Sequence, residues 1–203
     1  MIRYLLPVLG VASMAIAPAQ AQEAGAFGGF KLGVVTGYDS ATLEYADLEN
    51  DEDGVLYGVT AGYDMDLGSA VIGLELEASD STTKWRVTDA DFGDSVALAL
   101  GRDLYVGARI GIPVTSNLMI YAKGGYTNAR AKLSYNDGEG LVISDSDTLD
   151  GWRLGGGVEL TNANHFARVE YRYSDYGNYK DGGVDTGLSL SRQQVAVTGG
   201  FRF

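Results

Sequence analysis

The sequence predicts an all-β protein, an eight-stranded antiparallel transmembrane β-barrel, and three observations support this fold class. The last eleven residues, Gln193 to Phe203, alternate in character along the chain and end on an aromatic side chain. The first 21 residues have the pattern of a cleaved export signal. No long apolar run follows them, so a membrane-embedded mature chain must close its sheet, because an open edge would leave backbone groups unpaired in hydrocarbon.

The C-terminal strand has one apolar and one polar face, because side chains in a strand alternate with period two. The apolar face carries Val195, Val197, Phe201 and Phe203, and the polar face carries Gln194, Thr198 and Arg202. A chain that ends on the Phe of such a strand is similar to the substrates of the barrel-assembly machinery of the bacterial outer membrane. We therefore take Phe201 and Phe203 as a candidate barrel-assembly signal.

The N-terminus predicts export. Arg3 provides a positive start, an apolar stretch runs from Leu5 to Ala17, and Ala19-Gln20-Ala21 fits an A-x-A cleavage site bounded by Ala19 and Ala21. A short membrane anchor is the alternative, but the apolar stretch falls short of the roughly 20 residues that a spanning helix needs. We expect residues 1–21 to be a signal peptide and residues 22–203 to form one barrel domain.

Composition excludes several classes of function. The chain has no cysteine, which removes lipid-modified cysteine, disulfides, thiolate metal sites and cysteine nucleophiles. The formal charge is −12, and the signal segment carries only Arg3, so the mature chain has −13. This acidity argues against nucleic acid as a partner and against electrostatic attachment to anionic lipid.

Eight alternating segments make up the predicted barrel. They span about residues 27–39, 54–65, 70–79, 102–112, 117–129, 150–160, 166–176 and 193–203. Each has one face almost free of charge, as in Leu104, Val106, Ala108, Ile110 and Ile112 of the fourth. A soluble sandwich or lipocalin-like barrel can give a similar hydropathy pattern, and the residues of the polar face distinguish the two.

Short and long connections alternate between these segments. The short ones, Asp66 to Ser69, Pro113 to Ser116 and Thr161 to His165, are expected to face the periplasm. The long ones, at about 40–53, 80–101, 130–149 and 177–192, are rich in Asp, Gly and Ser and are expected outside. Ser95 to Leu100 is apolar enough to extend the fourth strand beyond the membrane as a projecting hairpin.

The polar face of the strands carries many charges interleaved with glycine. The members of this predicted lumen charge network are Lys31, Glu75, Glu77, Arg109, Lys123, Arg153, Glu159, Arg168, Glu170, Arg172 and Arg202. An eight-stranded barrel is just wide enough for side chains to fill, and buried charges are tolerated when they are paired. We interpret the set as a plug. The alternative is a narrow ion path, in which seven basic and four acidic positions would favour anions.

Two other features do not point to a chemical site. The first long connection, 40–53, contains Asp47, Glu49, Asp51, Glu52 and Asp53 and is followed by Gly54, but Thr60 stands where a calcium loop needs Glu, so we predict no metal site. The only histidine, His165, falls in a short periplasmic turn, far from the outer rim where histidine-dependent barrel enzymes work. We therefore expect no enzyme, no catalytic residue and no cofactor.

The segment from Val169 to Gly177 (VEYRYSDYG) resembles a stretch common in the OmpA-like and opacity-like small outer-membrane barrels of Gram-negative bacteria, the "porin family". Tyr121 to Tyr126 (YAKGGY) and the Phe-terminated last strand fit the same pattern. The resemblance extends over the mature chain and implies location in the outer membrane, an envelope-integrity role and surface exposure. It brings no catalytic residues.

Three hypotheses follow. The leading one is a monomeric outer-membrane barrel with a structural role, whose partners are outer-membrane lipid and the barrel-assembly machinery. The second is a surface receptor or adhesin that binds an unknown ligand through its acidic loops. The third is a small porin for ions or small solutes, which predicts a conductance that changes when Arg109, Lys123 or Arg172 is neutralised.

Overall fold

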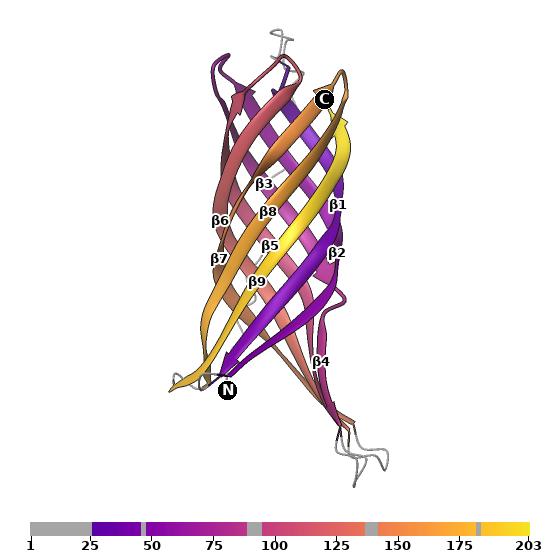
Figure 1. Cartoon of the computed structure of the whole chain (residues 1–203), viewed down its shortest axis with the longest axis vertical. Coiled ribbons are helices and arrows are strands. Elements are labelled where there is room, and N and C mark those ends of the chain that lie inside the picture. The colour runs from indigo at the N-terminus through magenta and orange to yellow at the C-terminus, as the bar shows by residue number, and fades with distance from the viewer. Residues whose placement is uncertain (1–25, 46–47, 89–94, 137–141, 182–183) are drawn as a thin grey trace, which may run out of the picture.

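The protein forms a closed antiparallel barrel in a computed structural model that describes residues 26–45, 48–88, 95–136, 142–181 and 184–203 (Figure 1). Neighbouring strands follow the order β3-β2-β1-β9-β8-β7-β6-β5, and pairing of β3 with β5 closes the ring of eight. A ninth, short strand, β4, adds to β5 outside this ring. The predicted fold class is therefore confirmed. The proposed signal peptide, with Ala19 and Ala21, lies outside the described residues.

The strands are longer than the alternating segments of the sequence. Their bounds are β1 Gly29–Tyr45, β2 Leu48–Asp66, β3 Val71–Ser81, β4 Lys84–Thr88, β5 Ser95–Pro113, β6 Leu118–Asn136, β7 Val142–Asn162, β8 His165–Asp181 and β9 Val184–Arg202. Most of the extra length lies on the side of the long connections. The eight strands of the barrel therefore agree with the prediction, and the observed strands differ from it mainly in extending farther at their ends.

Three short turns lie at one end of the barrel. The β2–β3 turn is closed by a hydrogen bond from the Leu67 amide to the Ala70 carbonyl of 2.8 Å, with Gly68 at a φ of +86°. The β5–β6 turn is closed by a 2.7 Å bond from the Val114 amide to the Leu118 carbonyl. The C-terminus lies at this same end, at the top of Figure 1. The three short connections fall where the sequence predicts them.

The opposite end consists largely of paired strand where the sequence suggests loop. β1 and β2 stay paired up to Tyr45 and Leu48, and β6 and β7 up to Asn136 and Val142. Asp, Gly and Ser have low strand propensity, but pairing with a neighbouring strand overrides that weak preference. β4 pairs with Ser95 to Ala99 of β5, so the projecting hairpin is confirmed. It extends from the lower end of the barrel in Figure 1.

The outer wall is apolar and the inside is charged. Leu74 is 69% exposed, Val34 66% and Ile112 64%, whereas Arg153, Arg172 and Glu159 are at most 1% exposed. An apolar outside around a polar inside is the arrangement of a barrel whose wall faces lipid. No stretch of helix with the length and hydropathy of a membrane span occurs in the part of the chain that the structure describes.

Pairing of β1 with β9 forms the seam between the ends of the chain. Phe203 donates its amide to the Phe30 carbonyl at 2.8 Å, and the Phe30 amide donates to the Phe203 carbonyl at 3.2 Å. The two rings also contact each other, with centroids 6.3 Å apart. Both candidate assembly residues face outward, with Phe201 56% and Phe203 74% exposed. They are therefore accessible on the wall at the short-turn end.

Candidate functional site

Among the residues that the structure describes, the lumen contains fourteen charged side chains in fourteen ion pairs, and every strand of the closed ring contributes at least one. We call this set the lumen network. Its acidic members are Asp39, Asp64, Glu75, Glu77, Asp103, Glu159 and Glu170, and its basic members are Lys31, Arg109, Lys123, Arg153, Arg168, Arg172 and Arg192. All are at most 5% exposed.

The network begins at the short-turn end with a group of four. Lys31 lies between Asp64, at 2.7 Å, and Glu159, with which it also pairs. Arg109 joins the same two carboxylates, donating Nε to Asp64 Oδ1 at 2.8 Å and Nη1 to Glu159 Oε2 at 2.9 Å. Two cations therefore share two anions here, which satisfies the charge of each.

The middle of the lumen continues the alternation. Arg168 donates Nε to Glu159 at 2.7 Å and pairs through Nη1 with Glu75. Lys123 then bridges Glu75 at 2.7 Å and Glu170 at 2.8 Å. These contacts bring together side chains from β7, β8, β3 and β6. Each carboxylate thus has a cation on either side.

The next contacts lead toward the long-hairpin end. Arg172 Nη1 lies 3.5 Å from Glu170 and 2.7 Å from Glu77. Arg153 then joins Glu77, at 3.5 Å, to Asp103, at 2.5 Å. Burying a charge is tolerated only when it is paired and hydrogen-bonded. The sequence of pairs gives each of these charges an ionic partner along the barrel axis, while Arg172 Nη2 is buried without a hydrogen-bond partner among the described residues.

The last pairs centre on Asp39. Arg192 joins Asp103, at 3.1 Å, to Asp39, at 2.6 Å. Asp39 also accepts hydrogen bonds from Gln194 Nε2 at 2.7 Å and from the Ser81 hydroxyl at 2.5 Å. The network is therefore one unbroken series of alternating charges from Asp64 to Asp39.

The structure corrects the predicted set in two ways. Arg202 does not lie among these buried side chains; it is at the short-turn end, donating to the carbonyls of Ala163 at 2.8 Å and Gly28 at 2.9 Å. Asp39, Asp64, Asp103 and Arg192 belong to the network and were missing from the prediction. The described lumen holds seven ionic groups of each sign, so the expected surplus of seven basic over four acidic positions is wrong.

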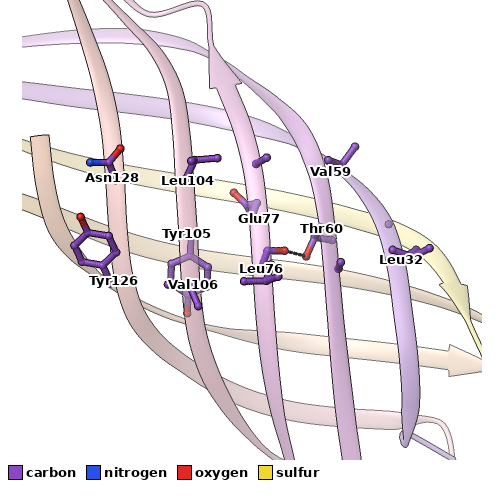
Figure 2. Close-up of a pocket in the computed structure, with 13 residues that line it drawn as sticks. Leu32, Val59, Thr60, Leu76, Glu77, Leu104, Tyr105, Val106, Tyr126 and Asn128 are labelled. Carbon is purple, nitrogen blue, oxygen red and sulfur yellow. Dashed lines mark hydrogen bonds between the residues drawn. The ribbon is translucent and has the colours of Figure 1, made fainter. Parts of the chain in front are cut away.

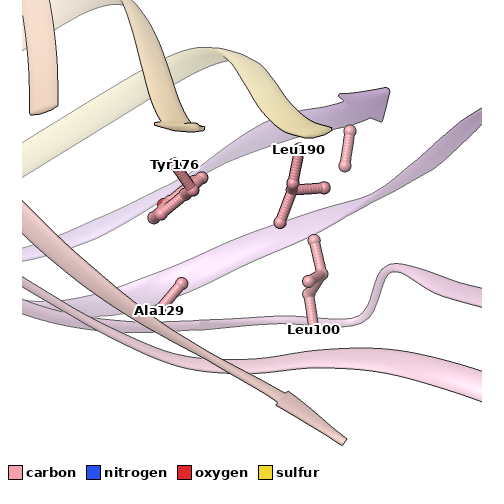
Figure 3. Close-up of a cluster of buried hydrophobic side chains, with 5 residues drawn as sticks. Leu100, Ala129, Tyr176 and Leu190 are labelled. Atoms are coloured by element: carbon pink, nitrogen blue, oxygen red, sulfur yellow. The ribbon is translucent and has the colours of Figure 1, made fainter. Parts of the chain in front are cut away.

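Two apolar clusters lie at the ends of the network. At the short-turn end Phe27, Val71, Met119 and Tyr121 pack together and are at most 4% exposed. At the other end, five strands contribute the buried cluster of Ala41, Leu100, Ala129, Tyr176 and Leu190 (Figure 3). The Tyr176 hydroxyl donates to Asp103 at 2.8 Å, which ties this outer cluster to the network.

Aromatic rings fill the space between the ions. Lys123 and Arg153 lie over the Tyr105 ring, 5.0 and 5.2 Å from its centroid. Arg109 and Arg168 lie over Tyr121 in the same way. Such contacts favour cations that have lost their water. The lumen is therefore packed by rings as well as by ion pairs.

Glycine makes room for these rings. A Cβ at Gly107 would collide with the Tyr105 hydroxyl end and lie 2.6 Å from the Gly124 carbonyl oxygen. No L side chain fits at that separation without displacing the strand. The interleaved glycines of the polar face thus have a packing role at this position.

No group of three or more His, Cys, Asp or Glu side chains suited to a metal ion occurs in the described ranges. His165 lies at the short-turn end, where its ring packs 5.0 Å from that of Phe201. The lumen carboxylates are held by cations on both sides, as described above. This arrangement favours fixed pairing over proton transfer or metal binding.

Comparison with known proteins agrees with the geometry. A family model described as "Outer membrane protein beta-barrel domain" matches residues 9–203. The 31 kDa outer-membrane immunogenic protein of Brucella melitensis biotype 1 is 30% identical over 146 residues, which are 68% of this chain and 61% of that protein. The 25 kDa outer-membrane immunogenic protein of Brucella abortus biovar 1 is 31% identical over 150 residues, 72% of this chain and 64% of that protein. The match thus spans less than two thirds of either relative.

Two solved structures share the fold at low sequence identity. Neisserial surface protein A has a TM-score of 0.52 at 13% identity, covering 85% of this chain and 97% of that one. The attachment invasion locus protein Ail of Yersinia pestis, in complex with a heparin analogue, has a TM-score of 0.50 at 12% identity, covering 86% and 99%. With a family model over most of its length, this chain belongs to the outer membrane β-barrel protein family and lies in the outer membrane.

Proposed function

We propose that this chain is a non-conducting, monomeric barrel that stabilises the outer membrane and presents hairpins of paired strands at the cell surface. The observation that supports this most directly is the continuous lumen network with an apolar cluster at each end. Because the lumen is filled, the parts of the chain that can contact lipid or a partner are the outer wall and the hairpins. Neither role needs a catalytic residue.

An ion that crossed the lumen would have to displace paired charges and pass two apolar clusters. Apolar constrictions oppose conduction because they exclude water. The described part of the lumen has equal numbers of basic and acidic groups, so it lacks the excess of positive charge that an anion path would use. The porin alternative therefore has less support than the structural role.

Single-channel recording of the refolded chain in a planar bilayer tests this proposal, once the unheated sample migrates on a gel as a compact barrel. We expect no conductance steps from the native chain. Arg172→Gln is expected to be silent as well, because both apolar clusters remain. Discrete steps that shift in size with Arg172→Gln would contradict the proposal and favour a lined pore.

The envelope role has its own test. Cells that lack the chain are expected to become more permeable to a hydrophobic dye and more sensitive to detergent, and the native chain should restore both properties. If cells without the chain keep the same permeability as cells that have it, the envelope role is wrong and surface display is the function left to test.

Surface recognition is the second candidate. It is supported by the paired hairpins that extend past the apolar wall and by the relatives' description as immunogenic outer-membrane proteins. Antibodies raised against the β4–β5 hairpin should bind intact cells that express the chain. Binding only after the cells are broken would contradict exposure of that hairpin.

A further inference from the structure

Four exposed cations gather on one side of the long-hairpin end, although the chain as a whole is acidic. They are Lys84 on β4, Arg102 on β5, and Arg130 and Lys132 on β6. We call them the basic rim. Lys84 and Lys132 both oppose Ala99 across the sheet, so they lie on the same face with only a small side chain between them.

A β-bulge brings the two arginines into this rim. The β5–β6 register shifts between Leu100 and Asp103, so Gly101 and Arg102 together oppose Arg130. The extra residue of a bulge redirects a side chain and strengthens the local twist. Arg102 is thereby exposed on the outer wall beside Arg130, while Leu100 and Asp103 both remain buried.

An apolar hollow of about 750 Å³ lies near the basic rim, and Figure 2 shows the side chains that line it. The lipid-facing side chains that line it include Leu76, Ala78, Leu104, Val106 and Tyr126, and Asn128 lies at its edge. Asn128 also accepts a hydrogen bond of 3.4 Å from Arg102 Nη2. The rim and the hollow are therefore continuous.

Two acidic side chains, Asp150 and Asp80, lie next to the basic rim. Asp150 accepts hydrogen bonds from the Tyr126 hydroxyl and from Asn128 Nδ2, the latter at 2.6 Å, which holds these side chains in place. Asp80 lies on β3 opposite Tyr57, and the pairing of Ser79 with Asp103 on the neighbouring strand β5 puts Asp80 at the level of Arg102. On the outer face of the described part of this region, the four cations of the rim therefore outnumber these two carboxylates.

We propose that this surface binds the phosphorylated glycolipid of the outer leaflet, with its phosphates on the basic rim and an acyl chain in the hollow. The rim lies at the end opposite the short turns, which are periplasmic in this kind of barrel, and this places it at the outer leaflet. Guanidinium and ammonium groups pair well with phosphate, Arg in a bidentate manner. Because the hollow beside the rim can hold an acyl chain, this surface suits a phosphorylated lipid better than a soluble polyanion.

Native mass spectrometry of the refolded chain in detergent, with purified lipid A as the probe, tests the proposal. The triple variant R102Q/R130Q/K132Q removes charge from the rim, and Ala78→Phe fills the hollow. Ala122→Phe adds the same bulk to an exposed position of β6 that does not line the hollow. A gel-mobility test confirms that each variant is folded before lipid is added.

The native chain should hold lipid A at least about tenfold more tightly than the triple variant, since each cation at an anionic lipid surface contributes appreciably. Ala78→Phe should also weaken the binding of lipid A, whereas Ala122→Phe should leave it unchanged. Dephosphorylated lipid A should bind to the native chain as weakly as lipid A binds to the triple variant. Equal binding by native and triple variant would overturn the proposal. So would equal binding of phosphatidylglycerol, because that result would indicate unspecific charge attraction.

Discussion

Arg172 on β8 and Glu77 on β3 form a 2.7 Å ion pair across the full width of the lumen. In the closed ring, three strands separate β8 from β3 in either direction. Arg168 and Glu75 join the same two strands again, one step closer to the short turns. The barrel is therefore cross-linked between opposite walls as well as between neighbouring strands.

Breaking this contact should destabilise the barrel strongly. Arg172→Gln leaves Glu77 and Glu170 buried with less positive charge, and losing one partner of a buried pair costs about 3–5 kcal/mol. Urea unfolding in lipid vesicles, followed by tryptophan fluorescence, measures the free energy of unfolding. The double variant R172Q/E77Q should lose less than the sum of the two single variants. Arg130→Gln, at an exposed position, serves as the control, and an equal loss there would refute the pairing argument.

Gly107→Ala should destabilise the chain by about 1–3 kcal/mol, because overpacking a filled interior forces side chains and backbone to move. The added methyl group would meet Tyr105 and the Gly124 carbonyl. The same urea experiment gives the value. Gly199→Ala is the matched control, because a Cβ there has no neighbour within 4 Å. If both variants unfold at the same urea concentration, Gly107 has no packing role.

The β4–β5 hairpin should be removable without loss of the barrel. The Leu100 amide bonds to the Thr83 carbonyl at 3.2 Å, so a two-residue Asn-Gly turn can replace residues 84–99. We expect the shortened chain to keep its compact mobility on an unheated gel and its β-type circular dichroism. Its melting temperature should fall somewhat, since Trp85 packs against the outer apolar cluster. Failure to refold would mean that the hairpin is needed to form the barrel.

Phe203→Ala should separate assembly in cells from intrinsic stability. The ring is largely exposed to lipid and contacts Phe30, so its loss should change the free energy of unfolding by less than about 2 kcal/mol. If the terminal aromatic is an assembly signal, the amount of chain in the outer membrane should fall while refolding in vitro continues. Val197→Ala on the same face is the control. Equal amounts of both variants in the membrane would argue against the signal.

The alternation of the strands predicted the barrel because every strand of a lipid-facing wall must place apolar side chains outside and polar side chains inside. It also identified ten of the lumen charges, from Lys31 to Arg172, since these lie within strongly alternating segments. Asp103 and Arg192 were missed because each stands at the edge of a predicted strand, although each lies two residues before a recognised inward position. Asp39 and Asp64 lie at the ends of alternating segments, and the ion pairs that make them members of the network come from residues far away in sequence.

The length of the hairpins was not predictable from local composition. Residues 130–149 read as loop because they contain several Asp, Ser and Gly, yet β6 and β7 pair through this region. Backbone pairing is set by the neighbouring strand, and a single chain segment carries little information about it. The end of each strand was therefore the least accurate part of the sequence prediction.

The bulge at Gly101 and Arg102 makes this point of β5 unusually tolerant to a change in chain length. Leu100 and Asp103 both face inward, three positions apart, so deletion of Gly101 would restore strict alternation without reversing either half of the strand. A one-residue deletion elsewhere in β5 would exchange its lipid-facing and lumen-facing side chains. Deletion of Gly101 would also set Arg102 directly opposite Arg130, where like charges repel. The extra residue thus keeps two cations on one wall without making them cross-strand partners.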